Sequence, residues 1–166
     1  MICFGIDPGI GTLGYGVVRQ RGDLLEALDY GAITTPPGLP LAVRLRDLYR
    51  MLSERLGAHA PDVAAVERLY FGRNTTTAEM VFQARGVVML AVADRGLAPY
   101  EPKPAEVKMA VCGNGAAEKA QVQGMVRHLL NLDTIPRPDD AADALAVAIT
   151  GLSLALYDRA ERRSVG

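Results

Sequence analysis

The chain has 166 residues, enough for one ordinary hydrophobic core, and its 49% hydrophobic and 22% charged residues are typical of a folded globular protein. No apolar stretch reaches the roughly 20 residues that span a bilayer, and no basic segment followed by an apolar block opens the chain, so we expect a cytoplasmic protein. The formal net charge of -1 excludes binding to nucleic acid through bulk charge, so any such site must come from local clusters of Arg and Lys.

The first third of the chain predicts an antiparallel meander. Residues 2–7, 13–20 and 24–34 are rich in apolar and β-branched side chains. The segments between them, 9–12 and 21–23, contain the glycines that tight turns require.

Helices and short strands alternate in the rest of the chain. Apolar residues at 41, 45, 48, 52 and 56 predict a helix that ends before Gly57. The expected elements after it are a strand over 61–67, a helix over 75–95, a last strand over 97–101, a short helix from 104 to 112, a helix over 117–130, a closing helix from 139 or 140, and a polar tail over 158–166.

This order of elements predicts one α/β domain over residues 1–157. Three meander strands followed by alternating helices and strands give a mixed five-stranded sheet with helices on both faces. Strands on either side of a crossover are often neighbours, so we expect the first and fourth strands to lie side by side.

Four carboxylates stand out because each interrupts an apolar run. Asp7 and Glu67 follow the first and fourth expected strands, and Asp140 and Asp143 are three residues apart in the closing helix, which places both on one helix face. A buried carboxylate is costly unless it is paired or binds a cation. We therefore expect these four acids to form one cluster at one end of the sheet.

Such a cluster favours divalent metal chemistry on phosphate. Neighbouring carboxylates cannot all stay ionised in a partly buried site without cations, and hard oxygen ligands select Mg²⁺ or Mn²⁺. Two such ions about 4 Å apart can activate water and stabilise both oxygens of an in-line displacement.

Each acid except Asp143, which lies among alanines away from a cap position, also has an ordinary structural explanation. These alternatives are an Asx-turn for Asp7, an ion pair of Glu67 with Arg68 or Arg44, and an N-cap role for Asp139 or Asp140. We take Asp139 as the cap or a solvated neighbour, and Asp140 as the residue that faces the site.

An ordered set of short motifs resembles one known family, the RuvC-type Holliday junction resolvases. The resemblance extends over roughly residues 1–150. Its motifs are GIDPG at 5–9, GYGV at 14–17, VE at 66–67, QARG at 83–86, AEK at 117–119 with QVQ at 121–123, and DAADALA at 140–146.

The resemblance implies a ribonuclease H-like nuclease domain that works as a homodimer. It implies paired symmetric nicks in four-way DNA junctions, with 5′-phosphate and 3′-hydroxyl products, two Mg²⁺ ions per site that Mn²⁺ can replace, and delivery of the substrate by the RuvA-RuvB branch-migration complex. Asp7, Glu67, Asp140 and Asp143 match the family's metal-binding acids. Lys108 and Lys119 match its basic residues near the active site, although solvated helix lysines are the ordinary alternative.

The loop after Glu67 resembles the family's aromatic wedge. We expect Tyr70 and Phe71 to stack on an unpaired base, and Arg73 and Asn74 to contact phosphate. Tyr70 stands at the position where the family usually has Phe, and a core aromatic that anchors the loop is the alternative for Phe71. The helix after this loop has more apolar surface than one core face requires and predicts a dimer interface. That expected interface consists of Met80, Val81, Ala84, Val87, Val88 and Ala91.

Two other functions fit parts of the sequence. The segment 5–12 also resembles the first phosphate loop of actin-like ATPases and sugar kinases, but those proteins need a second phosphate loop and a second domain. A non-catalytic DNA-binding module with this fold would be marked by loss of one or more acids. All four acids are present here, which favours the nuclease.

Overall fold

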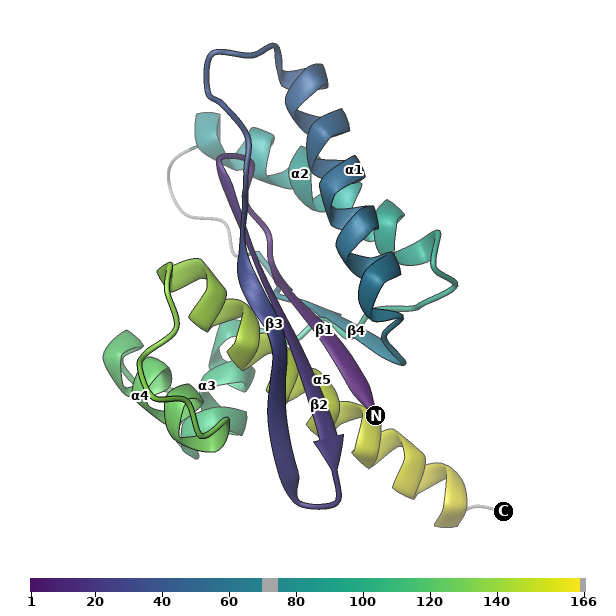
Figure 1. The fold of residues 1–166 in the computed structure, drawn as a ribbon, viewed down its shortest axis with the longest axis vertical. Helices are drawn as coiled ribbons and strands as arrows, with labels where there is room; N and C mark the ends of the chain where they lie inside the picture. The colour runs from purple at the N-terminus through teal and green to yellow at the C-terminus, as the bar shows by residue number, and fades with distance from the viewer. Residues whose placement is uncertain (70–74, 165–166) are drawn as a thin grey trace.

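The computed structural model describes residues 1–69 and 75–164, with the side chains of 75–78 left out of the description. Its elements alternate between strands and helices as the sequence predicts (Figure 1). In chain order they are β1 (Ile2–Asp7), β2 (Thr12–Arg21), β3 (Leu24–Thr34), α1 (Leu41–His59), β4 (Val63–Val66), α2 (Thr75–Ala93), α3 (Pro104–Cys112), α4 (Lys119–Leu129) and α5 (Asp139–Ser164).

The sheet is mixed and has the strand order β3-β2-β1-β4. β1, β2 and β3 form the expected antiparallel meander, and the tight turn between β2 and β3 contains Gly22 at a φ of 58°. β4 lies beside β1 and runs parallel to it, with Ile6 opposite Val66. The sheet therefore brings the carboxyl ends of β1 and β4 together at one edge, as expected for neighbours across a crossover.

The expected fifth strand over residues 97–101 is wrong, because the described sheet has four strands. One isolated parallel bridge, between Ala65 and Tyr100, lies in its place. The backbone of Tyr100 exchanges two hydrogen bonds with β4, but Pro99 and Pro102 beside it have no N–H to extend the ladder. The segment still aligns with β4 without continuing as a strand.

Helices cover the two faces of the sheet in separate groups (Figure 1). α1 and α2 pack on one face around a core that contains Phe4, Ile6 and Leu48. α3, α4 and α5 pack on the other face with Cys3 and Ala65. Alternate residues of β1 therefore point to different cores, which is the period-two pattern of a strand covered on both faces.

α5 lies unusually close to the sheet because glycines face it. A Cβ built at Gly5 would be 2.3 Å from the Ala144 carbonyl oxygen, and one built at Gly14 would be 2.0 Å from the Asp140 carbonyl oxygen. Both distances are far below van der Waals contact, so only glycine permits this approach. The glycines of the GIDPG and GYGV motifs thus fix where the first turns of α5 lie.

Two helices extend further than the sequence predicted. α1 continues through Gly57 to His59 and ends at Ala60, whose φ of 42° and N–H bond to the Leu56 carbonyl close the last turn. α5 continues to Ser164, so residues 158–164 of the expected polar tail are helical. By length and composition, α5 is the one described helix that could cross a membrane, but 67% of its apolar stretch is buried. It is a core helix here.

Candidate active site

The strand register places Asp7 and Glu67 side by side. Asp7 is the last residue of β1, and Glu67 directly follows β4, where its N–H donates to the Ile6 carbonyl oxygen at 3.0 Å. Both residues continue the alternation that turns Cys3 and Ala65 towards α5. The two carboxylates therefore lie on the α5 face of neighbouring strand ends.

α5 brings Asp140 and Asp143 to the same place. Asp7 pairs across the sheet with Gly14, and the backbone of Asp140 packs directly on Gly14. Asp143 is half-buried between fully buried alanines, so this polar side chain occupies an edge of the helix face that meets the sheet. The backbone positions of these acids, on β1, after β4 and on α5, therefore lie at the same end of the sheet.

Burial and neighbouring charges both act on the acids. Burial raises the pKa of Asp7 to about 7, and the charges of Asp143 and Asp140 contribute to this rise against the opposing effect of Lys119. Burial also raises the pKa of Glu67 to about 7, with contributions from Asp7 and Asp143. Both carboxyls therefore hold protons near neutral pH in the metal-free protein.

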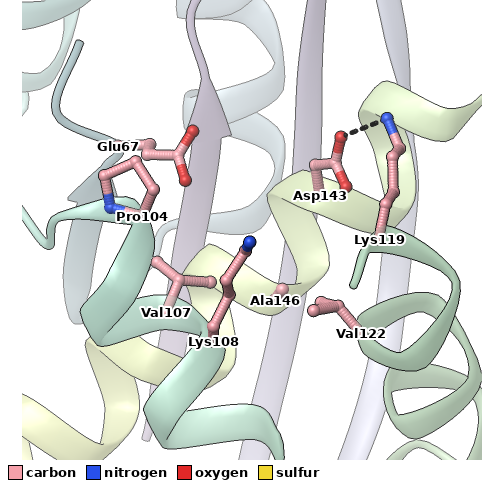
Figure 2. A pocket seen from close by; sticks show the side chains of 8 residues that line it. All are labelled: Glu67, Pro104, Val107, Lys108, Lys119, Val122, Asp143 and Ala146. Atoms are coloured by element: carbon pink, nitrogen blue, oxygen red, sulfur yellow. Dashed lines mark hydrogen bonds and ion pairs between the residues drawn. The ribbon is translucent and has the colours of Figure 1, made fainter. Parts of the chain in front are cut away.

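Two lysines balance part of this negative charge. Lys119 at the start of α4 donates to the Asp143 carboxylate at 2.9 Å, and Lys108 on α3 lowers the pKa of Glu67. Figure 2 shows Glu67 and Lys108 on one side of a pocket and the Lys119–Asp143 pair on the other. The expected basic residues thus face the acids and are not merely solvated helix lysines.

The pocket between these groups has a volume of about 200 Å³ and an apolar floor. This apolar lining comes from α3, α4 and α5 and lies beside the charged groups. Sequence reasoning did not identify these lining residues, because apolar residues on core helices look alike whether or not they border a site. They are Pro104, Val107, Val122 and Ala146.

Asp139 has a different role from its neighbour. It forms an ion pair with Arg137, and its other oxygen lies 3.7 Å from Lys119 Nζ. Asp140, in contrast, raises the pKa of Asp7. Asp139 therefore lies beside two cations, whereas the charge of Asp140 acts on Asp7.

The donor set suits a hard divalent cation, because it consists of carboxylate oxygens. As the side chains stand, no group of three acidic, His or Cys side chains within 1–69 and 75–164 is arranged to hold a metal ion. In this structure Asp143 is bonded to Lys119, and the raised pKa values of Asp7 and Glu67 favour their protonated forms near neutral pH. A metal ion at this site would have to compete with that lysine and with those protons, and the four carboxylates present fit such an exchange.

Other expected site residues fall outside this cluster. Tyr70, Phe71, Arg73 and Asn74 lie outside the described residues. Three of the expected interface residues need correction, since they are fully buried in the core of this chain, where their spacing of four and three residues places them on the α2 face that packs against α1. These three are Ala84, Val88 and Ala91. Met80 and Val87 are partly buried against the same core, and Val81 is half-buried.

The structure also tests the ion pair of Glu67 with Arg68 or Arg44 that the sequence allows. Arg44, considered as a partner of Glu67, instead donates hydrogen bonds to Ile10 and Thr35. Within residues 1–69 and 75–164, neither Arg68 nor Arg44 forms an ion pair with Glu67. A pairing role for Glu67 is therefore not supported, and the acid cluster remains its environment.

Comparisons with known proteins agree with this geometry. The family model described as "Crossover junction endodeoxyribonuclease RuvC" matches residues 3–151. A protein of that name from Chloroflexus aggregans is 54% identical over 149 residues, which cover 90% of this chain and 91% of the relative.

Two solved structures from Thermus thermophilus are also similar. A RuvC structure superposes with a TM-score of 0.88 at 37% identity, covering 95% of this chain and 97% of that chain. A second, described as "RuvC in complex with Holliday junction substrate", gives 0.87 at 35% identity and covers 95% and 96%.

Proposed function

This chain belongs to the RuvC family of crossover junction endodeoxyribonucleases and is a Holliday junction resolving endonuclease with a ribonuclease H-like resolvase fold, and we propose that its acid cluster carries the reaction. Asp7, Glu67, Asp140 and Asp143 would hold two Mg²⁺ ions, which Mn²⁺ can replace. The observation behind this is the convergence of these acids from β1, β4 and α5.

When bound, the ions supply an activated water and charge neutralisation at the phosphodiester. Without metal, Asp7 and Glu67 bind protons near neutral pH, and the Lys119 ammonium donates to Asp143. Bound cations would take the place of these protons and of this lysine contact. Released from Asp143, Lys119 is free to meet a phosphate oxygen, and Lys108 faces the same pocket from α3. Hydrolysis would leave 5′-phosphate and 3′-hydroxyl ends.

A homodimer would explain paired symmetric cuts. A four-way junction has two-fold symmetry, so an isologous dimer can present one site to each of two strands. α2 carries the exposed Leu90, with an exposed fraction of 54%, on the side away from the core. We place the dimer contact there, in place of the buried Ala84, Val88 and Ala91, and we expect sedimentation to give a dimer.

The remaining expectations follow from the family. The protein would act in the cytoplasm with a RuvA-RuvB branch-migration complex, which would deliver the junction. Adding that complex should increase cleavage of a junction with long arms, and no change would argue against the partnership.

The direct test of function is a cleavage assay on a synthetic four-way junction with Mg²⁺. The wild type should give paired symmetric nicks that a ligase seals, and Asp7→Asn should still bind the junction without cutting it. Asp23→Asn makes the same chemical change at the exposed turn between β2 and β3, so it is the matched control and should cut normally. Absence of cutting by the wild type with both Mg²⁺ and Mn²⁺ would refute the proposal.

The wedge role of the loop over 70–74 needs its own variants. Tyr70→Ala and Phe71→Ala should lower cleavage more than binding, because loss of base stacking affects the opened junction. Arg73→Ala and Asn74→Ala should instead weaken binding itself. Equal cleavage by both aromatic variants and wild type would remove the wedge.

A further inference from the structure

One buried arginine lies behind the acid cluster without being part of it. On α1, the buried positions are Arg44, Leu48, Leu52 and Leu56, a stripe with a spacing of four residues. Leucine would continue the stripe, yet its first position holds an arginine that is 8% exposed. A buried guanidinium loses its hydration, so its place must be secured by hydrogen bonds.

Within the described residues, Arg44 donates hydrogen bonds to the segment that follows β1 and to the segment that follows β3. Arg44 Nε donates to Thr35 Oγ1 at 3.0 Å, and one terminal nitrogen donates to the carbonyl oxygens of Ile10 at 3.2 Å and Thr35 at 3.4 Å. Among the residues that the structure describes, it forms no ion pair with a carboxylate. The Arg44 guanidinium thus donates to backbone carbonyl oxygens and to a hydroxyl oxygen.

The loop that Arg44 holds begins directly after Asp7. Thr35 joins the same network, because its hydroxyl donates to the Ile10 carbonyl and its N–H donates to the Gly11 carbonyl at 3.1 Å. Ile10 is itself buried in the core between the sheet and α1. Ile10 follows Asp7 by three residues, so a contact that fixes Ile10 also restricts the chain that leaves the end of β1.

We propose that Arg44 is a positioning residue that fixes the loop after Asp7, and through it the carboxylate that the metal site needs. The inference rests on the proposed function, because it concerns the same acid cluster. The guanidinium holds its donors in a fixed planar geometry, so Nε reaches the Thr35 hydroxyl while a terminal nitrogen reaches the two carbonyl oxygens. Groups that orient a metal ligand without touching the metal raise metal affinity, and Arg44 would act on Asp7 in this sense through the loop and not by direct contact.

The test is metal binding measured without DNA. Mn²⁺ titration calorimetry on Arg44→Met should give a dissociation constant about tenfold weaker than wild type, the size of effect typical of lost support behind a ligand. The Mg²⁺ concentration for half-maximal junction cleavage should rise equally, while turnover at saturating Mg²⁺ stays close to wild type. Arg44→Lys should recover part of the loss.

Controls separate this role from a general effect on folding. Arg46→Met changes an exposed arginine on the same helix and should leave metal affinity unchanged. If Arg44→Met does not fold, Thr35→Val removes the bridging hydroxyl with little change in shape and should weaken Mn²⁺ binding in the same direction. A purely structural role for Arg44 would lower the melting temperature without moving the metal affinity.

The outcomes distinguish the two proposals. If wild type binds no Mn²⁺ and cuts no junction, the proposed function fails. If wild type binds and cuts while Arg44→Met, Arg44→Lys and Thr35→Val all keep the wild-type metal affinity, only the role of Arg44 is overturned.

Discussion

Replacing Asp7 by Asn should stabilise the metal-free protein while destroying its metal site. Burial and the neighbouring acids raise the pKa of Asp7 from 3.8 to about 7. At about 1.4 kcal/mol per pKa unit, the charged form is disfavoured by about 4 kcal/mol as an upper limit. Part of this penalty on the charged form is shared with Glu67, whose protonation is coupled to that of Asp7. We therefore expect the free energy of unfolding to rise by about 2 kcal/mol at alkaline pH, or the melting temperature by about 4 to 8 °C for a chain of this size.

The sign of the pH dependence follows from the two pKa values. The unfolded chain releases the Asp7 proton near 3.8 and the folded chain near 7, so the folded state binds more protons between them. The stability of the metal-free wild type should therefore fall as pH rises through this window. The advantage of Asp7→Asn should shrink to less than about half at about pH 5, where folded Asp7 is still protonated.

Thermal unfolding in EDTA and in Mg²⁺, at about pH 5 and about pH 8, measures both effects. Mg²⁺ should raise the melting temperature of wild type and leave that of Asp7→Asn unchanged, since only a bound ion stabilises. Asp23→Asn at an exposed turn should match wild type throughout. A less stable Asp7→Asn at alkaline pH in EDTA, or an advantage that does not change with pH, would refute the charge-repulsion reasoning.

Three further predictions follow from the same geometry. Gly14→Ala should lower cleavage about 100-fold or more, because its Cβ would collide with the Asp140 carbonyl and move α5. Gly124→Ala on α4, with open space around it, is the control and should cut normally. Equal activities of the two variants would contradict the glycine contact. At limiting Mg²⁺, cleavage should rise with pH through about 7 as Asp7 and Glu67 lose their protons, and a flat profile across that range would argue against it. Lys119→Met should shift this rise to higher pH, because Lys119 lowers both pKa values, while Lys103→Met at an exposed position should leave it in place.

Local patterns predicted most of the fold because they agree with the tertiary structure. The meander strands and the helices from α2 onwards begin close to their expected positions, and Asp7 and Glu67 lie at strand ends as expected. The fifth strand failed because Pro99 and Pro102 remove donors from a segment whose composition otherwise favours a strand. A single bridge there depends on tertiary alignment, which composition does not reveal.

The parts of the site that could not be predicted depend on contacts between distant segments. The surplus of apolar residues on α2 suggested an interface, but Ala84 and Val88 are needed in the core, and only burial distinguishes the two uses. Arg44 showed one usable signal, an arginine in the first position of a leucine stripe. Its partners Ile10 and Thr35 are 34 and 9 residues away, so the hydrogen bonds themselves are visible only in the structure.

A crystal structure of the protein grown with Mn²⁺ tests the central claim most directly. We predict anomalous density for ions coordinated by Asp7, Glu67, Asp140 and Asp143, with Lys119 no longer bonded to Asp143. Ions bound elsewhere, or an acid cluster that stays unoccupied at saturating Mn²⁺ with the Lys119–Asp143 pair intact, would contradict it.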